Sequence, residues 1–391
     1  MLTATRREWN ELYVFFNLLA QGGIVLGNEE GLPSGRVLPI FQVTRQEHDG
    51  ERRYTVEETD IHVEGEQMDE RFPREDFGTV AAMILDTLKR ERNEEVEAPE
   101  GVEGFLDALK IYDMEARTDD RTDFYITFHD SSFPPVGFRI YSRLCAMMPL
   151  LDGGRTANLK FEQGGIRFSQ PAVNKINYTD DPDNPNEVAR RMLYIESMGG
   201  VLKYNDVADK VFRSNLCMID LNLPRVLAEM VRLMHLDNIS RVDELTELIE
   251  ERNPLKIKEE LIRKHRYYRY KMKEFLLALA LGMRPAKQYN GTDSAVAGFV
   301  MVDAEGRMVA YRKTERQVFA DFLFKHTRLE KGHPEKDKYG YLERENRAYY
   351  LKLNLKISFV KRLRSKVFCP FLCAVKYGIL KLLVFGFCTI S

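Results

Sequence analysis

Two short β-type runs within residues 122–144 hold the side chains of this chain best suited to chemistry. The stretch reads TDFYITFHDSSFPPVGFRIYSRL, with Asp123 opening the first run and Arg139-Ile140-Tyr141 inside the second. Metal-dependent cleavage of a phosphodiester needs an acid on one strand and an acid-x-lysine pair on its neighbour, because the carboxylates hold Mg²⁺ and the ion generates hydroxide. That scaffold is present here, but a tyrosine stands in the lysine position.

A helix near the N-terminus could supply a further metal ligand. The run EWNELYVFFNLLA, residues 8–20, has apolar residues at helical spacing and stops at Gly22-Gly23. Glu8 and Glu11 lie three apart and therefore share one helix face. Glu11 is the candidate ligand, and a solvated helix face is the plainer alternative for both glutamates.

Two further segments could serve other chemistry. The first segment is His129-Asp130. Strand alternation places His129 on the same face as Asp123, which would suit a histidine-based nuclease, but no partner His or Asn motif follows. The basic, aromatic run KIKEELIRKHRYYRYKMK, residues 256–273, is the strongest local signal for nucleic acid. The alternative is a solvated helix whose tyrosines line the core.

The surrounding pattern predicts a mixed α/β (α+β) fold without a sharp boundary before about residue 360. Alternating runs VLPIFQVTR and RYTVEETDIHV predict strands, AVAGFVMVDAEGRMVAYRK a hairpin, and YYLKLNLKISFV a terminal strand. Helices are expected in NEVARRMLYIESMGG and over 77–92, 224–236, 242–251 and 255–281.

Composition sets wide bounds. The 391 residues are 44% hydrophobic, and 58 basic and 60 acidic residues give a net charge of −2. This net charge does not exclude a nucleic-acid-binding protein, because phosphate contacts depend on local cations. The five cysteines show no paired CxxC spacing, so neither a zinc site nor a disulfide framework is predicted. The opening MLTATRREWNEL lacks a signal-peptide core, and we expect a cytoplasmic protein.

The tail over 361–391 is atypical, apolar and cysteine-rich. Lys376 and Lys381 interrupt its apolar run, whereas a membrane span needs about 20 largely uncharged residues. An appended tail that joins no core is favoured over a membrane anchor.

Several blocks in register resemble the HpaII-type restriction endonucleases, over about residues 6–360. REWNELYVFFNLLA is similar to that family's GEWSEIYVFFKLLA helix, TDFYITFHD to its ADI-x-I-x-IHD strand, and GFRIYSRL to its GFSIKSQL. TANLKF, FRSNLCMIDLNLP, FLLALALGM and YYLKLNLKISF resemble further family blocks in order and approximate spacing.

The resemblance implies a type II restriction endonuclease with a PD-(D/E)xK-like core that cuts double-stranded DNA with Mg²⁺ at a short palindrome, CCGG in the family's best-known member. It implies one domain over 1–360, with a catalytic core at about 100–170, a mainly helical part at about 186–285 and a β-containing part at about 290–360. A homodimer suits a palindrome, a cognate DNA methyltransferase is expected in the same system, and no membrane partner is expected.

Carried over residue by residue, Asp123 takes the family's metal-binding aspartate and Glu11 its helix glutamate. The family's serine and catalytic lysine positions fall on Arg139 and Tyr141. The residues matched to DNA binding lie just beyond this strand and are Ser142, Arg143 and Asn158.

The tyrosine leaves the activity open. A phenol has an ordinary pKa of about 10 and supplies no fixed positive charge at neutral pH. Arg139 and Arg143 share the strand face of Tyr141, but an arginine stays protonated and transfers protons poorly. Losing a catalytic electrostatic group commonly costs on the order of 10²–10³ in rate. An impaired endonuclease, a catalytically silent DNA-binding relative, and an interaction protein tethered through its tail are the competing hypotheses.

Overall fold

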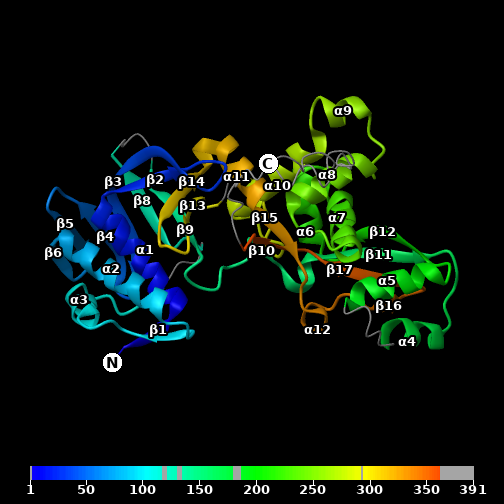
Figure 1. The fold of residues 1–391 in the computed structure, drawn as a ribbon, viewed down its shortest axis with the longest axis horizontal. Coiled ribbons are helices and arrows are strands. Elements are labelled where there is room, and N and C mark those ends of the chain that lie inside the picture. The colour runs from blue at the N-terminus through cyan, green and yellow to red at the C-terminus, as the bar shows by residue number, and fades with distance from the viewer. Residues whose placement is uncertain (1, 117–120, 130–133, 179–185, 292–293, 362–391) are drawn as a thin grey trace, which may run out of the picture. The chain divides into compact units, whose positions relative to one another are not determined.

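A large mixed sheet positions the predicted chemistry in the computed structural model, which describes residues 2–116, 121–129, 134–178, 186–291 and 294–361 (Figure 1). Its two central strands are those predicted from the segment 122–144. Within the described residues its strand order is β2 (Gly23–Gly27), β14 (Met308–Arg312), β13 (Val296–Val302), β9 (Val136–Ser142), β8 (Phe124–Phe128), β3 (Pro33–Glu47), β4 (Gly50–Val56), β5 (Asp60–Gly65) and β6 (Met68–Pro73).

Strand β9 has neighbours from distant parts of the chain. It runs antiparallel to β8, with Phe124 opposite Phe138, and parallel to β13, with Met301 opposite Tyr141. The β13–β14 pair is the predicted hairpin, and β3 with β4 and β5 are the predicted alternating strands.

The helix α1 (Arg6–Gln21) begins and ends at the signals that the sequence carries. The Thr5 hydroxyl accepts the backbone N–H of Glu8, and the Glu8 carboxylate accepts the backbone N–H of Thr5, which forms a capping box. Gly22 closes the helix with a left-handed φ of 59°. Glu8 therefore caps the helix, whereas Glu11 on the next turn is buried.

Two hydrophobic cores meet at β9, because successive strand residues face opposite sides. Phe138 belongs to a first core, built from α1, α2 (Arg74–Arg90), α3 (Val102–Ala108) and one face of the sheet. Tyr141 belongs to a second core that includes Phe299 and Phe359. In Figure 1, α1 and α2 lie beside β4 and β5.

The second core is formed mainly by helices and smaller sheets. In the described residues one sheet holds β12 (Val201–Val207), β11 (Asn158–Gly164), β17 (Ala348–Asn354) and β16 (Leu342–Glu345), and another holds β10 (Leu151–Asp152), β18 (Lys356–Phe359) and β15 (Thr327–Glu330). The pair β1 (Thr3–Thr5) and β7 (Glu95–Glu97) belongs to the first core, in which Ala4 and Val96 are buried. The helices are α4 (Gln170–Tyr178), α5 (Glu187–Ser197), α6 (Lys210–Ile219), α7 (Leu223–Asp237), α8 (Val242–Arg252), α9 (Glu259–Arg263), α10 (Tyr267–Ala280), α11 (Arg316–His326) and α12 (Pro334–Asp337).

Most predicted elements are confirmed, and two are divided. The single helix expected over 255–281 is wrong: α9 and α10 are separated by Arg266, whose φ of 50° is left-handed. The terminal strand is split at Leu355, whose backbone N–H donates to the Ala157 carbonyl, so β17 and β18 join different sheets. The mixed α/β prediction itself is confirmed.

Residues up to Val360 form one compact unit. In the part of the chain that the structure describes, every helix falls short of the length and apolarity that crossing a membrane requires. The predictions about the tail concern residues outside the described ranges.

Candidate active site

Asp123 is held at the start of β8 by two contacts to β9. Its backbone N–H donates to the Phe138 carbonyl at 2.8 Å, and the Ile140 N–H donates to Asp123 Oδ2 at 2.6 Å. These bonds turn the carboxylate toward the middle of the neighbouring strand. The backbone of the two central strands therefore orients this side chain.

Glu11 reaches the same place from α1. Its Oε1 accepts the Ala116 N–H at 2.7 Å and Arg45 Nη2 at 3.3 Å. Arg45 is fully buried and also donates to Glu47 Oε2 at 2.7 Å and to the Met114 carbonyl at 2.7 Å. The guanidinium is thus shared with a second carboxylate and neutralises Glu11 only in part.

The two carboxylates line one cavity of about 30 Å³, together with Asn10, Arg139 and Ser142. Burial raises the pKa of Glu11 to about 7, Arg45 lowers it, and the nearby Asp123 raises it further. Burial likewise raises the pKa of Asp123 to about 6, against the Ile140 N–H and Arg139, which lower it. Arg7 also lines the cavity and lowers the pKa of Asp123, so burial outweighs the attraction of the nearby arginines at both acids.

Arg139 and Tyr141 share a strand face but have different surroundings. The half-buried Arg139 lies beside Asp123, with its guanidinium carbon 5.3 Å from the centre of the Tyr141 ring. Tyr141 is 1% exposed, and its ring packs edge-on against Phe299 and Phe359 at 5.1 and 5.0 Å. Burial raises its pKa, and its hydroxyl has no hydrogen-bond partner among the described residues.

The residues matched to DNA binding make contacts within the protein. Ser142 is buried and accepts the Leu144 N–H, and Arg143 Nη2 donates to the Val360 carbonyl. The Asn158 amide donates to the Asp337 and Lys338 carbonyls and accepts from Asn354. The assignment of these three residues to DNA binding stays a prediction, and Asn158 is 2% exposed in this conformation.

The histidine constellation does not assemble with Asp123. His129 follows β8 at its far end, so at about 3.3 Å per residue it lies about 20 Å along the strand from Asp123. Its backbone N–H donates to the Pro39 carbonyl and its ring contacts Phe41. Asp130 lies outside the described residues.

Several cations of the 256–273 segment are used in ion pairs. Lys271 pairs with Asp220 at 3.1 Å and Arg269 with Glu247 at 3.5 Å. Tyr268 is 1% exposed and lies in the second core. These contacts match the alternative of a solvated helix with tyrosine in the core.

The donor set fits a hard divalent cation. Mg²⁺ is commonly held by one or two carboxylates, with waters and substrate phosphate oxygens completing six ligands. Glu11 and Asp123 offer such a pair, and no group of three or more His, Cys, Asp or Glu side chains suited to a metal occurs among the described residues. In such a site, waters and substrate phosphate oxygens supply the remaining ligands.

Asn10 is a site residue that the sequence pattern did not single out. It is 3% exposed, lines the cavity beside Glu11, and its Oδ1 has no hydrogen-bond partner in the described ranges. Its position next to Glu11 on a helix gives no signal in sequence, because adjacent helical residues usually face different directions.

Comparison with known proteins identifies the family of this chain. A sequence model of the HpaII restriction endonuclease family matches residues 5–359. The chain belongs to the HpaII restriction endonuclease family. Membership places it with the site-specific deoxyribonucleases and confirms the resemblance on which Asp123 and Glu11 were chosen.

A characterised family member is similar over nearly its whole length. The type II restriction enzyme HpaII of Haemophilus parainfluenzae is 29% identical over 363 residues, which cover 92% of this chain and 99% of that enzyme. No solved structure matches the present chain significantly.

Proposed function

We propose that this chain is a Mg²⁺-dependent type II restriction endonuclease that cuts double-stranded DNA at a short palindrome, with CCGG as the first target to test. The observation that carries the proposal is the pair of buried carboxylates, Asp123 and Glu11, in one cavity at the edge of β8 and β9. We assign β8 and β9, with α1 beside them, to a PD-(D/E)xK-like core.

The two carboxylates would hold the metal, and their chemistry explains why. Both have raised pKa values because they are desolvated close to each other, so a divalent cation would favour the ionised form of each. When bound, Mg²⁺ would supply the charge that stabilises the pentavalent phosphate and would lower the pKa of an attacking water. The Ile140 N–H keeps Asp123 oriented toward the cavity throughout.

Arg139 is the residue that we assign to the positive charge missing at the lysine position. It lines the same cavity as Asp123 and lowers the pKa of that carboxyl. A guanidinium can hold a phosphate oxygen through two parallel N–H donors, which would orient the scissile group. Because it stays protonated, it cannot relay a proton, and we therefore propose an impaired rather than a fully efficient enzyme.

A catalytically silent DNA-binding relative is the second candidate, and the surroundings of Tyr141 favour it. The hydroxyl is enclosed in the second core without a partner in the described part of the chain, so it offers the substrate neither charge nor an accessible donor. The two functions differ in turnover and share the same DNA surface.

Cleavage of plasmid DNA by the purified full chain in Mg²⁺ separates the two candidates. Discrete fragments from the unaltered protein would support the endonuclease. Fragments only from Tyr141→Lys would support an enzyme that has lost its catalytic lysine on an intact scaffold. Tyr141→Met is the matched control, because Met also removes the ring but carries no charge. Silence from all three folded proteins, together with no binding of duplex DNA, would refute the nuclease proposal.

The remaining assignments follow from the class of enzyme. A symmetric dimer would match a palindromic site, a cognate methyltransferase would protect the host DNA, and the cytoplasm is the expected compartment. Sedimentation of the chain with and without a CCGG duplex tests the dimer. A monomer in both conditions would contradict it.

A further inference from the structure

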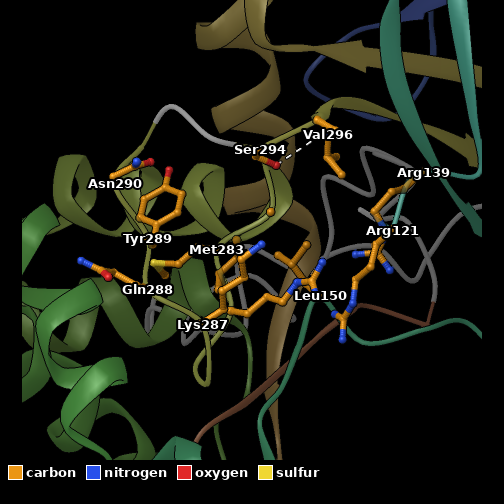
Figure 2. A pocket seen from close by; sticks show the side chains of 14 residues that line it. Arg121, Arg139, Leu150, Met283, Lys287, Gln288, Tyr289, Asn290, Ser294 and Val296 are labelled. Atoms are coloured by element: carbon orange, nitrogen blue, oxygen red, sulfur yellow. Dashed lines mark hydrogen bonds between the residues drawn. The ribbon is translucent and has the colours of Figure 1, made fainter. Parts of the chain in front are cut away.

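A second cavity, of about 220 Å³, borders the candidate active site and shares Arg139 with it. Four cations line it: Arg121 before β8, Arg139 on β9, and Arg284 and Lys287 in the loop after α10. Figure 2 shows Arg121 and Arg139 at one side and Lys287, Gln288 and Tyr289 at the other. None of the described residues that line the cavity is acidic.

These four cations have no acidic partner among the described residues. Within the described ranges none of them forms a salt bridge. Burial lowers the pKa of Arg121, and so do the neighbouring Arg284 and Arg139. Like charges held together in a partly desolvated cavity repel one another, and a bound anion would relieve that repulsion.

The loop that carries two of the cations is held in place by a buried side chain. Asn215 is 1% exposed, and its amide nitrogen donates to the Arg284 carbonyl at 2.9 Å and to the Lys287 carbonyl at 2.8 Å. Its Oδ1 accepts the Tyr289 N–H at 3.0 Å. The cations therefore project from a backbone that is fixed before any ligand arrives.

We propose that this pocket binds a backbone phosphate of the DNA duplex next to the phosphate that is to be cleaved. The inference rests on the proposed function and adds to it a binding site of stated chemistry. Arg139 reaches both cavities, so a strand whose scissile phosphate lies at Asp123 would place a neighbouring phosphate among Arg121, Arg284 and Lys287. Such contacts fix register and add affinity for any sequence.

Duplex binding as a function of salt tests the pocket directly. The full-length double variant Arg284→Ala/Lys287→Ala is compared with the wild type by fluorescence anisotropy in EDTA, on one duplex with CCGG and one without. Each lost phosphate contact reduces the magnitude of the slope of log affinity against log salt by about 0.9. At 0.1 M salt this corresponds to an affinity that is about eightfold weaker. The pair is therefore expected to weaken binding about 60-fold, equally on both duplexes.

A matched control removes two cations elsewhere on the surface. Arg71 and Arg90 are exposed and pair with Glu57 and Asp86, so the double variant Arg71→Ala/Arg90→Ala changes the net charge by as much as the pocket double variant does. Its affinity and slope are expected to equal those of the wild type. An equal loss in the control would show an effect of net charge and overturn the assignment.

The other outcomes also decide the matter. A wild type that binds duplex DNA with an unchanged double variant would overturn the pocket and leave the proposed function standing. A wild type that binds no duplex at any salt concentration would overturn both. Stabilisation by inorganic phosphate that the double variant loses, without any change in duplex binding, would assign the pocket to a free anion instead. Thermal unfolding of each variant confirms that it is folded.

Discussion

Asp123→Asn should stabilise the metal-free protein, and this is the sharpest test of how the site is built. Asparagine has the shape of aspartate, and its Oδ1 can still accept the Ile140 N–H that Asp123 accepts at 2.6 Å. The substitution therefore removes a desolvated charge while keeping the contact that orients the side chain. It also relieves Glu11, whose pKa the Asp123 carboxylate raises.

The magnitude follows from the pKa of Asp123, which burial raises from 3.8 to about 6. An acid whose pKa is higher in the folded than in the unfolded protein destabilises the folded state once it ionises. For Asp123 this loss of stability grows as the pH rises from the unfolded-state pKa to the folded-state pKa, and it is complete above about pH 6. That difference corresponds to a penalty of about 3 kcal/mol in the ionised form. We expect the variant to gain about 2–3 kcal/mol at pH 8 and nothing below about pH 4.

Urea unfolding in EDTA at pH 8 and pH 4 measures the gain, and added Mg²⁺ should stabilise the wild type but not the variant. Asp86→Asn is the control, since Asp86 is an exposed acid paired with Arg90, and its free energy of unfolding should change by less than about 0.5 kcal/mol. A variant that is no more stable than the wild type at pH 8 would refute the reasoning that the site holds an uncompensated charge.

Three further predictions concern the same strands. Tyr141→Phe removes a buried hydroxyl without a partner in the described residues, so the free energy of unfolding by urea should stay level or rise by about 1 kcal/mol; a tenfold fall in plasmid cleavage would contradict its exclusion from the reaction. Mg²⁺ affinity by calorimetry should increase about 100-fold from pH 5.5 to pH 8, because binding must displace protons from Glu11, of pKa about 7, and Asp123, of pKa about 6; a flat profile would remove them as ligands. Gly137→Ala would place a Cβ 2.4 Å from the backbone oxygen of Ala295, which precedes β13, and should lower the free energy of unfolding by urea by about 1–3 kcal/mol. Gly104→Ala is the control, because its Cβ would lie in open space and should cost nothing. Equal effects of the two substitutions would contradict the close approach at Gly137.

Local signals in the sequence predicted much of the fold. Thr5 and Gly22 bound α1, and the turn around Gly306 marks the β13–β14 hairpin, because caps and turns depend on a few neighbouring residues. The break at Leu355 could not be seen, since its partner, Ala157, lies far away in the chain and the alternation continues through the break.

The candidate site was only partly predictable for the same reason. Family resemblance located Asp123 and Glu11, but their raised pKa values come from burial, which a residue list does not contain. The basic pocket was missed because its cations are scattered along the chain at positions 121, 139, 284 and 287. Conversely, the compact basic run at 256–273 forms ion pairs with acids from other elements.

The placement of β9 between early and late parts of the chain bears on the order in which the enzyme is assembled during synthesis. Its β8 neighbour is translated directly before it, but β13 begins only at Val296, and Phe359, which packs on Tyr141, follows later still. Domains tend to fold as units when their sequence has emerged from the ribosome. A nascent fragment that already holds both carboxylates of the proposed metal site would thus still lack one neighbour of its central strand, and DNA cleavage should begin only with the nearly finished polypeptide.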